Sequence, residues 1–135
     1  MQMPEPDASV IAQRDLIVRR LREVLPEDAV ISAEREVRAY ECDALTAYRC
    51  PPLAVILPRS TEEVAAALRL LHGMGVPVVP RGSGTSLAGG ALPTADCVIL
   101  GVARLNKVLE TNYPDRYVRV QTGVTNLSVT GAVQA

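Results

Sequence analysis

A strand, a helix and a second strand are predicted in close succession in the middle of the chain, and this succession constrains the fold most. Leu53–Pro58 (LAVILP) is a continuous apolar run of strand length, which is typical of a parallel sheet covered on both faces. Ser60 and Glu63 form a capping-box pattern, so a helix is predicted to begin at Thr61. Val76–Val79 is the next predicted strand. The pattern predicts a compact βαβ unit in an α/β (α+β) fold, with a small parallel sheet flanked by helices.

Further elements are predicted on both sides of this unit. Ser9 is expected to cap a helix that runs to about Leu25, and Glu34–Tyr40 gives a second, weaker helix. Cys97–Val102 is a third candidate for a buried strand. The remaining predictions are two strands, Val108–Thr111 and Tyr117–Thr122, around a turn at Asn112–Arg116, and then a terminal helix capped by Thr125.

Length and composition limit the class of protein. A chain of 135 residues is at most one ordinary domain. Its apolar content of 48% and net charge of −1 describe a globular protein and argue against a nucleic-acid binder. With four tyrosines as its aromatic residues, a base-stacking platform is not expected. We expect an N-terminal helical segment over residues 1–45, followed by the body of the fold over residues 46–135.

Several kinds of site are not predicted. Cys42, Cys50 and Cys97 lack a C-x-x-C spacing and the chain has one histidine, so we expect free thiols and no metal. Glu41 and Asp43 are expected to be solvated loop residues, and no catalytic constellation is found. No apolar run of about 18 residues is present, so no transmembrane segment is expected. The acidic start does not resemble a secretory signal, and a cytoplasmic location is expected.

The stretch Pro80–Pro93 (PRGSGTSLAGGALP) is the candidate functional site. Its four glycines admit positive φ, so that several backbone N–H groups can turn toward one concavity suited to a phosphate or pyrophosphate. The loop follows the second strand of the βαβ unit, and ligands of open α/β sheets gather at the carboxyl ends of strands. A glycine-rich surface turn without a ligand is the alternative. The residues in question are Gly82, Gly84, Gly89 and Gly90, with hydroxyl groups on Ser83, Thr85 and Ser86.

Two common phosphate loops do not fit this stretch. A Rossmann fingerprint counted from Gly82 needs a third glycine where Leu87 stands, and Gly101–Leu109 holds no acidic residue for a ribose. A P-loop counted from Gly84 has Gly90 at its lysine position. A different kind of phosphate cradle is therefore predicted.

Three segments together resemble the start of the FAD-binding domain of the vanillyl-alcohol oxidase/p-cresol methylhydroxylase (PCMH) type. They are AVILPRSTEEV, VPVVPRGSGTSLAGGALP and RVQTGVTN. Within that family the chain is most similar to the 2-hydroxy-acid-oxidising subgroup, which includes the flavoprotein subunit of glycolate oxidase and D-lactate dehydrogenases. The resemblance implies that residues 46–135 form the N-terminal half of such a domain, truncated relative to family members.

The resemblance also implies which residues hold the cofactor. Members that attach flavin covalently place a histidine in this loop, where this chain has Thr85, so FAD is expected to bind non-covalently. The loop would wrap the FAD pyrophosphate with backbone amides. By resemblance, Arg81, Gly82, Ser83, Gly84, Thr85 and Ser86 would make that contact, Gly89 and Gly90 would shape its far side, and Pro58, Pro80 and Gly123 would lie near the cofactor.

The implied activity is oxidation of a 2-hydroxy acid, glycolate or D-lactate, by hydride transfer to FAD. Family members are far longer, and the parts that supply substrate-binding and catalytic residues are not in these 135 residues. Substrate binding and turnover are therefore expected only in a full-length context. The alternatives are a truncated, non-catalytic fragment and a generic phosphate- or nucleotide-binding module. Leu127, Val129 and Val133 would face a partner subunit or the remainder of the enzyme.

Overall fold

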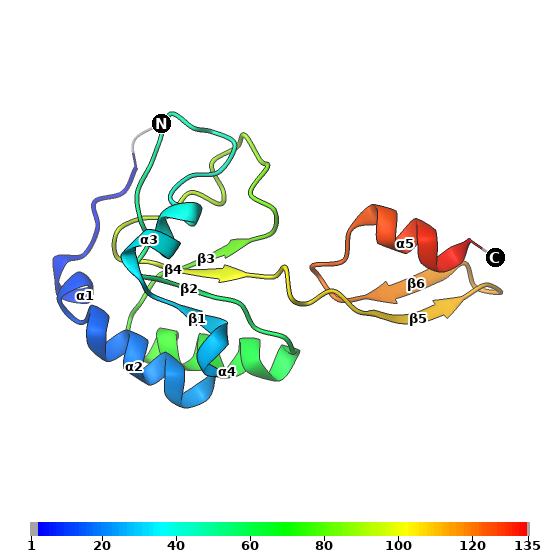
Figure 1. Ribbon diagram of the computed structural model, residues 1–135, viewed down its shortest axis with the longest axis horizontal. Helices are drawn as coiled ribbons and strands as arrows, with labels where there is room; N and C mark the ends of the chain where they lie inside the picture. Colours follow the sequence, from blue (N-terminus) through cyan, green and yellow to red (C-terminus); the bar gives the residue numbers. More distant parts are fainter. Residues whose placement is uncertain (1–2, 135) are drawn as a thin grey trace.

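A four-stranded mixed sheet forms the centre of the fold in the computed structural model, which describes residues 3–134 (Figure 1). Its strand order is β1-β2-β4-β3. The strands β2 (Ala54–Ile56), β4 (Val98–Gly101) and β3 (Val78–Arg81) run parallel, and β1 (Val30–Ile31) is antiparallel to β2. The predicted α/β fold with a small parallel sheet is confirmed.

The βαβ unit forms as predicted, with α4 (Thr61–Gly73) as its helix. The Ser60 hydroxyl accepts a hydrogen bond from the Glu63 N–H at 3.2 Å. In return, the Glu63 carboxylate accepts a hydrogen bond from the N–H of Arg59, the residue before Ser60. At the other end Gly75 has φ +68°, and the N–H of Val76 donates to the carbonyl of Leu71 at 2.9 Å. This left-handed cap reverses the chain into β3. The two strands of the unit are not neighbours, because β4 inserts between them.

Helices cover both faces of the sheet, which explains why its strands are apolar throughout. Helices α2 (Arg14–Val24) and α4 lie on one face, while α3 (Glu34–Val37) and the short 3-10 helix η2 (Arg38–Tyr40) lie on the other (Figure 1). The larger core lies under α2 and α4, and the smaller one packs under α3. The first contains Leu21, Ala54, Ile56, Leu71, Val98 and Leu100, and the second contains Val37, Val55, Cys97 and Ile99.

The N-terminal region differs from the prediction in two ways. Asp7, and not Ser9, caps the first helix, since its carboxylate accepts from the N–H of Ser9 at 2.8 Å. The predicted single helix is interrupted at Gln13, which separates α1 (Ala8–Ala12) from α2. A 3-10 helix, η1 (Glu27–Ala29), then leads into β1. Residues of α1, α2 and β1 pack in the main core, and the division at residue 45 stays a prediction.

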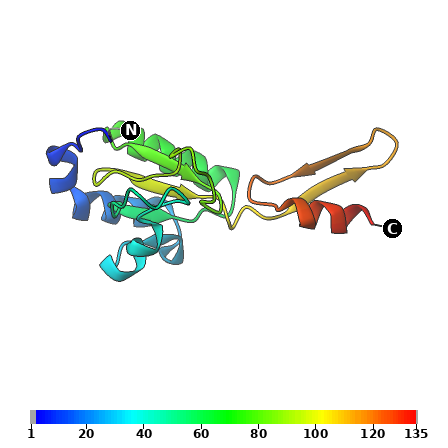
Figure 2. The ribbon, with the colours of Figure 1, turned by 90° about the horizontal axis from the view of Figure 1, so that it is seen from above.

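A hairpin and a helix stand apart from the sheet (Figure 1), and Figure 2 shows the same separation from above. The antiparallel strands β5 (Val108–Asn112) and β6 (Tyr117–Val120) form the predicted hairpin, with a register shift near its start. Helix α5 (Asn126–Val133) packs beside β5, and the Thr125 hydroxyl caps it by accepting from the Ser128 N–H at 3.2 Å. Leu127 on this helix is 81% exposed.

Candidate cofactor site

The carboxyl ends of the three parallel strands bring the candidate residues to one edge of the sheet. The glycine loop begins directly after Arg81, the last residue of β3. Pro58 lies two residues beyond β2, and Val102 directly follows β4. The strands are in register, with Ile56 and Pro80 both opposite Leu100. This edge is where ligands of open α/β sheets bind.

The glycine loop presents backbone donors that the protein itself does not use. Gly84 and Gly89 have φ values of +70° and +78°, as glycine readily permits. Among residues 3–134, the N–H groups of residues 82–86 donate no hydrogen bond to a protein acceptor. The side chains of Ser83, Thr85 and Ser86 are exposed beside them. Unused N–H groups and hydroxyls in one exposed turn suit an anion such as a pyrophosphate.

The Arg81 side chain lies between this turn and the segment of Tyr40 and Cys42. Its Nη1 donates to the carbonyl of Cys42 at 2.6 Å, and its guanidinium carbon lies 5.6 Å from the centroid of the Tyr40 ring. The guanidinium also borders Gly84, because a Cβ built on residue 84 would lie 2.8 Å from Nε and collide with the group. Arg81 therefore lies in the predicted place, but its charged end is already engaged.

Gly123 and the two prolines frame the same edge. Pro58, two residues after the end of β2, is fully buried, whereas Pro80 is exposed on β3, an edge strand of the sheet. The N–H of Gly123 donates to the carbonyl of Leu105 at 2.8 Å, and a Cβ here would collide with the carbonyl oxygen of Val102. The structure thus brings Gly123 from the far end of the sequence to the carboxyl end of β4.

An apolar hollow of about 490 Å³ lies at this edge on the α4 face of the sheet. Val64 and Leu68 lie one turn apart on α4 and both line the hollow, where Leu68 remains 41% exposed. Helix α4 carries more apolar residues than the core covers, and this excess was the sequence signal from which the hollow could have been predicted. Its walls are Val64, Leu68, Val78, Pro80, Leu100, Val102 and Leu105, with Thr61, Gln121 and Thr122 at the polar positions.

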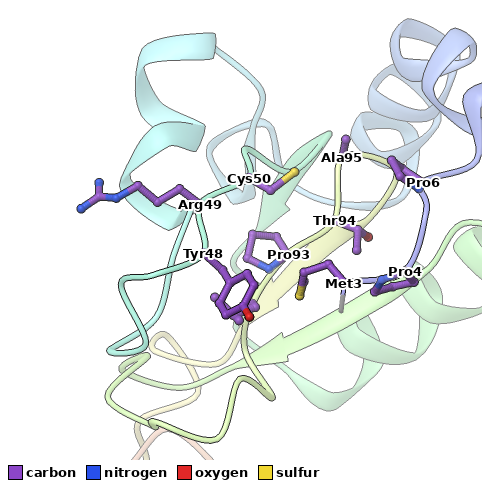
Figure 3. Close-up of a pocket in the computed structure, with 10 residues that line it drawn as sticks. Met3, Pro4, Pro6, Tyr48, Arg49, Cys50, Pro93, Thr94 and Ala95 are labelled. Carbon is purple, nitrogen blue, oxygen red and sulfur yellow. The ribbon is translucent and has the colours of Figure 1, made fainter. Parts of the chain in front are cut away.

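A second pocket, of about 230 Å³, lies at the opposite end of the strands (Figure 3). Cys50 and Ala95 come before β2 and β4 respectively, so this pocket is at their amino ends. Met3 and Tyr48 face its interior, while the Arg49 side chain extends away from it (Figure 3). Leu92 and Pro93, at the end of the glycine-rich stretch, also line this pocket, whereas residues 82–86 do not, so it lies apart from the turn with the unused N–H groups.

Comparison with known proteins decides the family. A family model described as an FAD binding domain matches residues 52–135, which include both the βαβ unit and the glycine loop. The chain belongs to this FAD-binding domain family. Its described fold resembles that of p-cresol methylhydroxylase, with a TM-score of 0.80 at 20% identity over 96% of this chain and 25% of that structure. The PCMH-type resemblance and the predicted lobe are confirmed.

Two curated relatives of this FAD-binding domain show what the chain is similar to in sequence. Glycolate oxidase subunit GlcD of Escherichia coli (strain K12) is 45% identical over 89% of this chain and 24% of its own length. The mitochondrial D-lactate dehydrogenase [cytochrome] of Kluyveromyces lactis is 43% identical over 54% of this chain and 13% of its own length. The chain thus spans about a quarter of the length of the glycolate oxidase subunit.

Two carboxylates of this chain are buried, which the sequence did not predict. Asp43, expected to be solvated, is 4% exposed, so that prediction was wrong. Its Oδ1 accepts a hydrogen bond from the N–H of Leu45 at 2.8 Å, which stabilises a turn of the chain at this position. Its Oδ2 has no hydrogen-bond partner among the described residues. Asp96 is also buried, and its Oδ2 accepts from the N–H of Asp7 at 2.9 Å. Asp43 thus holds a local backbone turn, whereas Asp96 connects the N-terminal segment to the chain that precedes β4.

The three thiols are free in the described chain, as predicted. Burial raises the pKa of Cys97 from 9.0 to about 11, and desolvation also raises the pKa of Cys50. Neither thiol is therefore activated as a nucleophile at neutral pH. Among residues 3–134 no group of three or more histidine, cysteine or acidic residues could hold a metal ion. Within the same range, none of the helices combines the length and apolarity needed to cross a membrane.

Proposed function

We propose that this chain is the cofactor-binding part of a flavin-dependent oxidoreductase that oxidises a 2-hydroxy acid, glycolate or D-lactate. The observation that carries the proposal is the glycine loop with its unused N–H donors at the carboxyl edge of the sheet. Membership of the FAD-binding domain family supports FAD as the ligand. The choice of substrate rests on similarity to a glycolate oxidase subunit and to a D-lactate dehydrogenase.

The FAD pyrophosphate would bind in the concavity of residues 82–86. Backbone N–H groups would donate to its oxygens, and the hydroxyls of Ser83, Thr85 and Ser86 would add neutral donors. Gly89 and Gly90 would shape the far side of the loop, while Pro58, Pro80 and Gly123 would border it. The loop 80–93 contains no histidine, cysteine or tyrosine, which favours non-covalent binding.

The apolar hollow beside α4 would receive part of the ring system of the cofactor. Ligand pockets combine apolar walls with a few polar groups, and the hollow has this character, with Gln121 and Thr122 at one side. Pro80 forms part of its wall and lies two residues before Gly82, so one ligand could occupy both features. This arrangement would distinguish FAD from a bare phosphate.

FAD, when bound, would supply the hydride acceptor that no side chain provides. The residues of this chain would bind and orient it, and none of them is assigned to touch the substrate. Since the chain spans about a quarter of the glycolate oxidase subunit, substrate binding and turnover are proposed for the protein in a full-length context. Contacts with the remainder of the enzyme or a partner subunit would then cover Leu127, which is exposed.

An FAD titration of the purified chain, followed by flavin fluorescence, tests the cofactor proposal. We expect micromolar binding, and we expect Gly84→Asp to abolish it because the new side chain would collide with the Arg81 guanidinium and strain the left-handed turn that presents the N–H groups. Leu127→Asp is the matched control, because it adds the same charge on exposed α5, away from the loop. Circular dichroism confirms that each variant is folded.

Two results would contradict the cofactor proposal. If the folded parent chain binds no FAD, the alternative of a truncated, non-catalytic fragment is favoured. Equal affinity for FAD and ADP would leave a generic nucleotide module, because the flavin ring would then add nothing.

A further inference from the structure

The side chain of Arg81 connects two segments that lie far apart in the sequence. On one side its Nη1 donates to the carbonyl of Cys42 at 2.6 Å and its guanidinium lies over the Tyr40 ring. On the other side the same guanidinium fills the space next to Gly84 that a Cβ would need. The Arg81 side chain therefore connects the turn that carries the unused N–H donors to the segment of Tyr40 and Cys42.

We propose that Arg81 is a positioning residue for the pyrophosphate loop, which it holds in its binding conformation by joining Gly84 to the Tyr40–Cys42 segment. The inference rests on the proposed FAD site. It gives the guanidinium a role different from that of a countercharge for the phosphates. The backbone N–H groups at residues 82–86 remain the donors to the ligand.

The direction of the side chain supports this role. Side chains alternate between the faces of a strand, and Val79 packs in the small core under α3. Arg81, two residues later, points to the same face, where it meets Tyr40. The strong, short hydrogen bond to a carbonyl and the ring contact fix the planar guanidinium in one orientation. A lysine, with no planar fork, cannot make this set of contacts together.

The segment that Arg81 meets is itself held in place. The N–H of Cys50 donates to the carbonyl of Glu41 at 2.8 Å, and Arg49 pairs with the Glu41 carboxylate at 3.0 Å. Asp43 is buried beside it and accepts from Leu45. The loop of residues 41–50 is thus closed on itself and can act as a fixed support for the glycine turn.

The two roles differ in their dependence on charge and salt. A phosphate countercharge would keep much of its effect in Arg81→Lys, and its loss would reduce the salt dependence of FAD binding. A positioning residue would lose its effect in Arg81→Lys and leave the salt dependence unchanged. Removing the support from the other side, by Tyr40→Leu, would weaken binding although no charge changes.

The experiment measures FAD affinity at several salt concentrations for the parent chain, Arg81→Lys, the uncharged variant Arg81→Gln, Tyr40→Leu and the conservative variant Tyr40→Phe. We expect Arg81→Lys and Tyr40→Leu each to weaken binding about tenfold with an unchanged salt slope, the size of one lost charge-assisted contact. Tyr40→Phe keeps the ring beneath the guanidinium and should restore the affinity lost in Tyr40→Leu.

Hydrogen exchange of the ligand-free chain separates this inference from the proposed function. In Arg81→Lys the hydrogen-bonded amides of Cys50, in the 41–50 loop, and of Ala88 and Leu92, in the glycine loop, should exchange faster together, whether or not FAD binds. Parent-like affinity in Arg81→Lys, or a lower salt slope in Arg81→Gln, would overturn the positioning role. Unchanged exchange of these amides in Arg81→Lys would overturn it as well, even if the parent chain binds no FAD.

Discussion

The backbone at Gly123 lies so close to the carbonyl oxygen of Val102 that a Cβ on residue 123 would collide with it. Its own N–H donates to the carbonyl of Leu105 at 2.8 Å, and the N–H of Gln121 donates to Lys107 at 2.9 Å. These contacts fasten the chain after β6 to the chain after β4. Gly123 is therefore the close approach that joins the hairpin and α5 to the sheet.

Replacing Gly123 with alanine should loosen this junction. The added methyl group meets backbone, which cannot move aside as a flexible side chain could. We expect a loss of about 1–3 kcal/mol in the free energy of unfolding, measured with urea. Gly131→Ala is the control, because its Cβ meets nothing within 4 Å and should stabilise α5 by up to about 1 kcal/mol. Equal stability of Gly123→Ala and the parent would refute the assigned role.

A second prediction concerns the left-handed turn of the cofactor loop. Gly84→Ala places a side chain at φ +70° and against the Arg81 guanidinium, so we expect a cost of about 1–2 kcal/mol and a clear loss of FAD affinity. Gly82→Ala should leave the stability unchanged, because a Cβ there meets nothing within 4 Å. Urea unfolding and the FAD titration measure the two effects. Similar stabilities for the two variants would contradict the left-handed conformation.

The hollow beside α4 predicts a ring-specific effect. Leu68→Gln replaces an apolar wall residue by a polar one of similar size without adding charge. FAD affinity should fall several-fold, while competition by inorganic pyrophosphate, which has no ring, should be unchanged. His72→Gln is the matched control, being exposed on the same helix and outside the wall of the hollow. Equal weakening of both ligands by Leu68→Gln would place the ring system elsewhere.

The Cys97 thiol predicts a fall in stability at alkaline pH. Burial raises its pKa from 9.0 to about 11, so above pH 9 the unfolded chain loses this proton more readily than the folded chain. This contribution to stability is complete below pH 9 and is lost as pH rises toward 11, by up to about 2–3 kcal/mol. Urea unfolding between pH 8 and 11 measures it, and Cys97→Ala should show a shallower decline. Parallel declines in the two proteins would assign the pH effect to other groups.

Much of the sheet could be predicted because its signals are local. The apolar run at Leu53–Pro58, the cap at Ser60 and the left-handed Gly75 each act within a few residues of their own position. The glycine loop was predictable for the same reason, since its composition and its place after a strand suffice. The strand order could not be read in this way, because the insertion of β4 between β2 and β3 depends on pairing across the chain.

The features that were missed depend on distant partners. The two-residue strand β1 exists because Val30 and Ile31 pair with β2, and a run this short carries no periodicity of its own. Asp43 resembles an ordinary loop acid in the sequence, and its burial follows from the inward turn of the 41–50 loop. The engagement of Arg81 with Cys42 spans 39 residues and has no sequence signature.

The outer edge of the sheet has a consequence for self-association. The N–H groups of Val98 and Val102 donate to the carbonyls of Pro77 and Arg81. The backbone polar groups of the odd-numbered residues of β3 therefore point toward β4, and those of Pro80 point away from the sheet. A proline nitrogen carries no hydrogen, so a foreign strand approaching this edge would find a donor missing at its middle. Main-chain addition, the usual route from an open edge to fibrils, is thereby disfavoured. The carboxyl end of β3 can stay accessible to a small molecule without inviting another chain to extend the sheet.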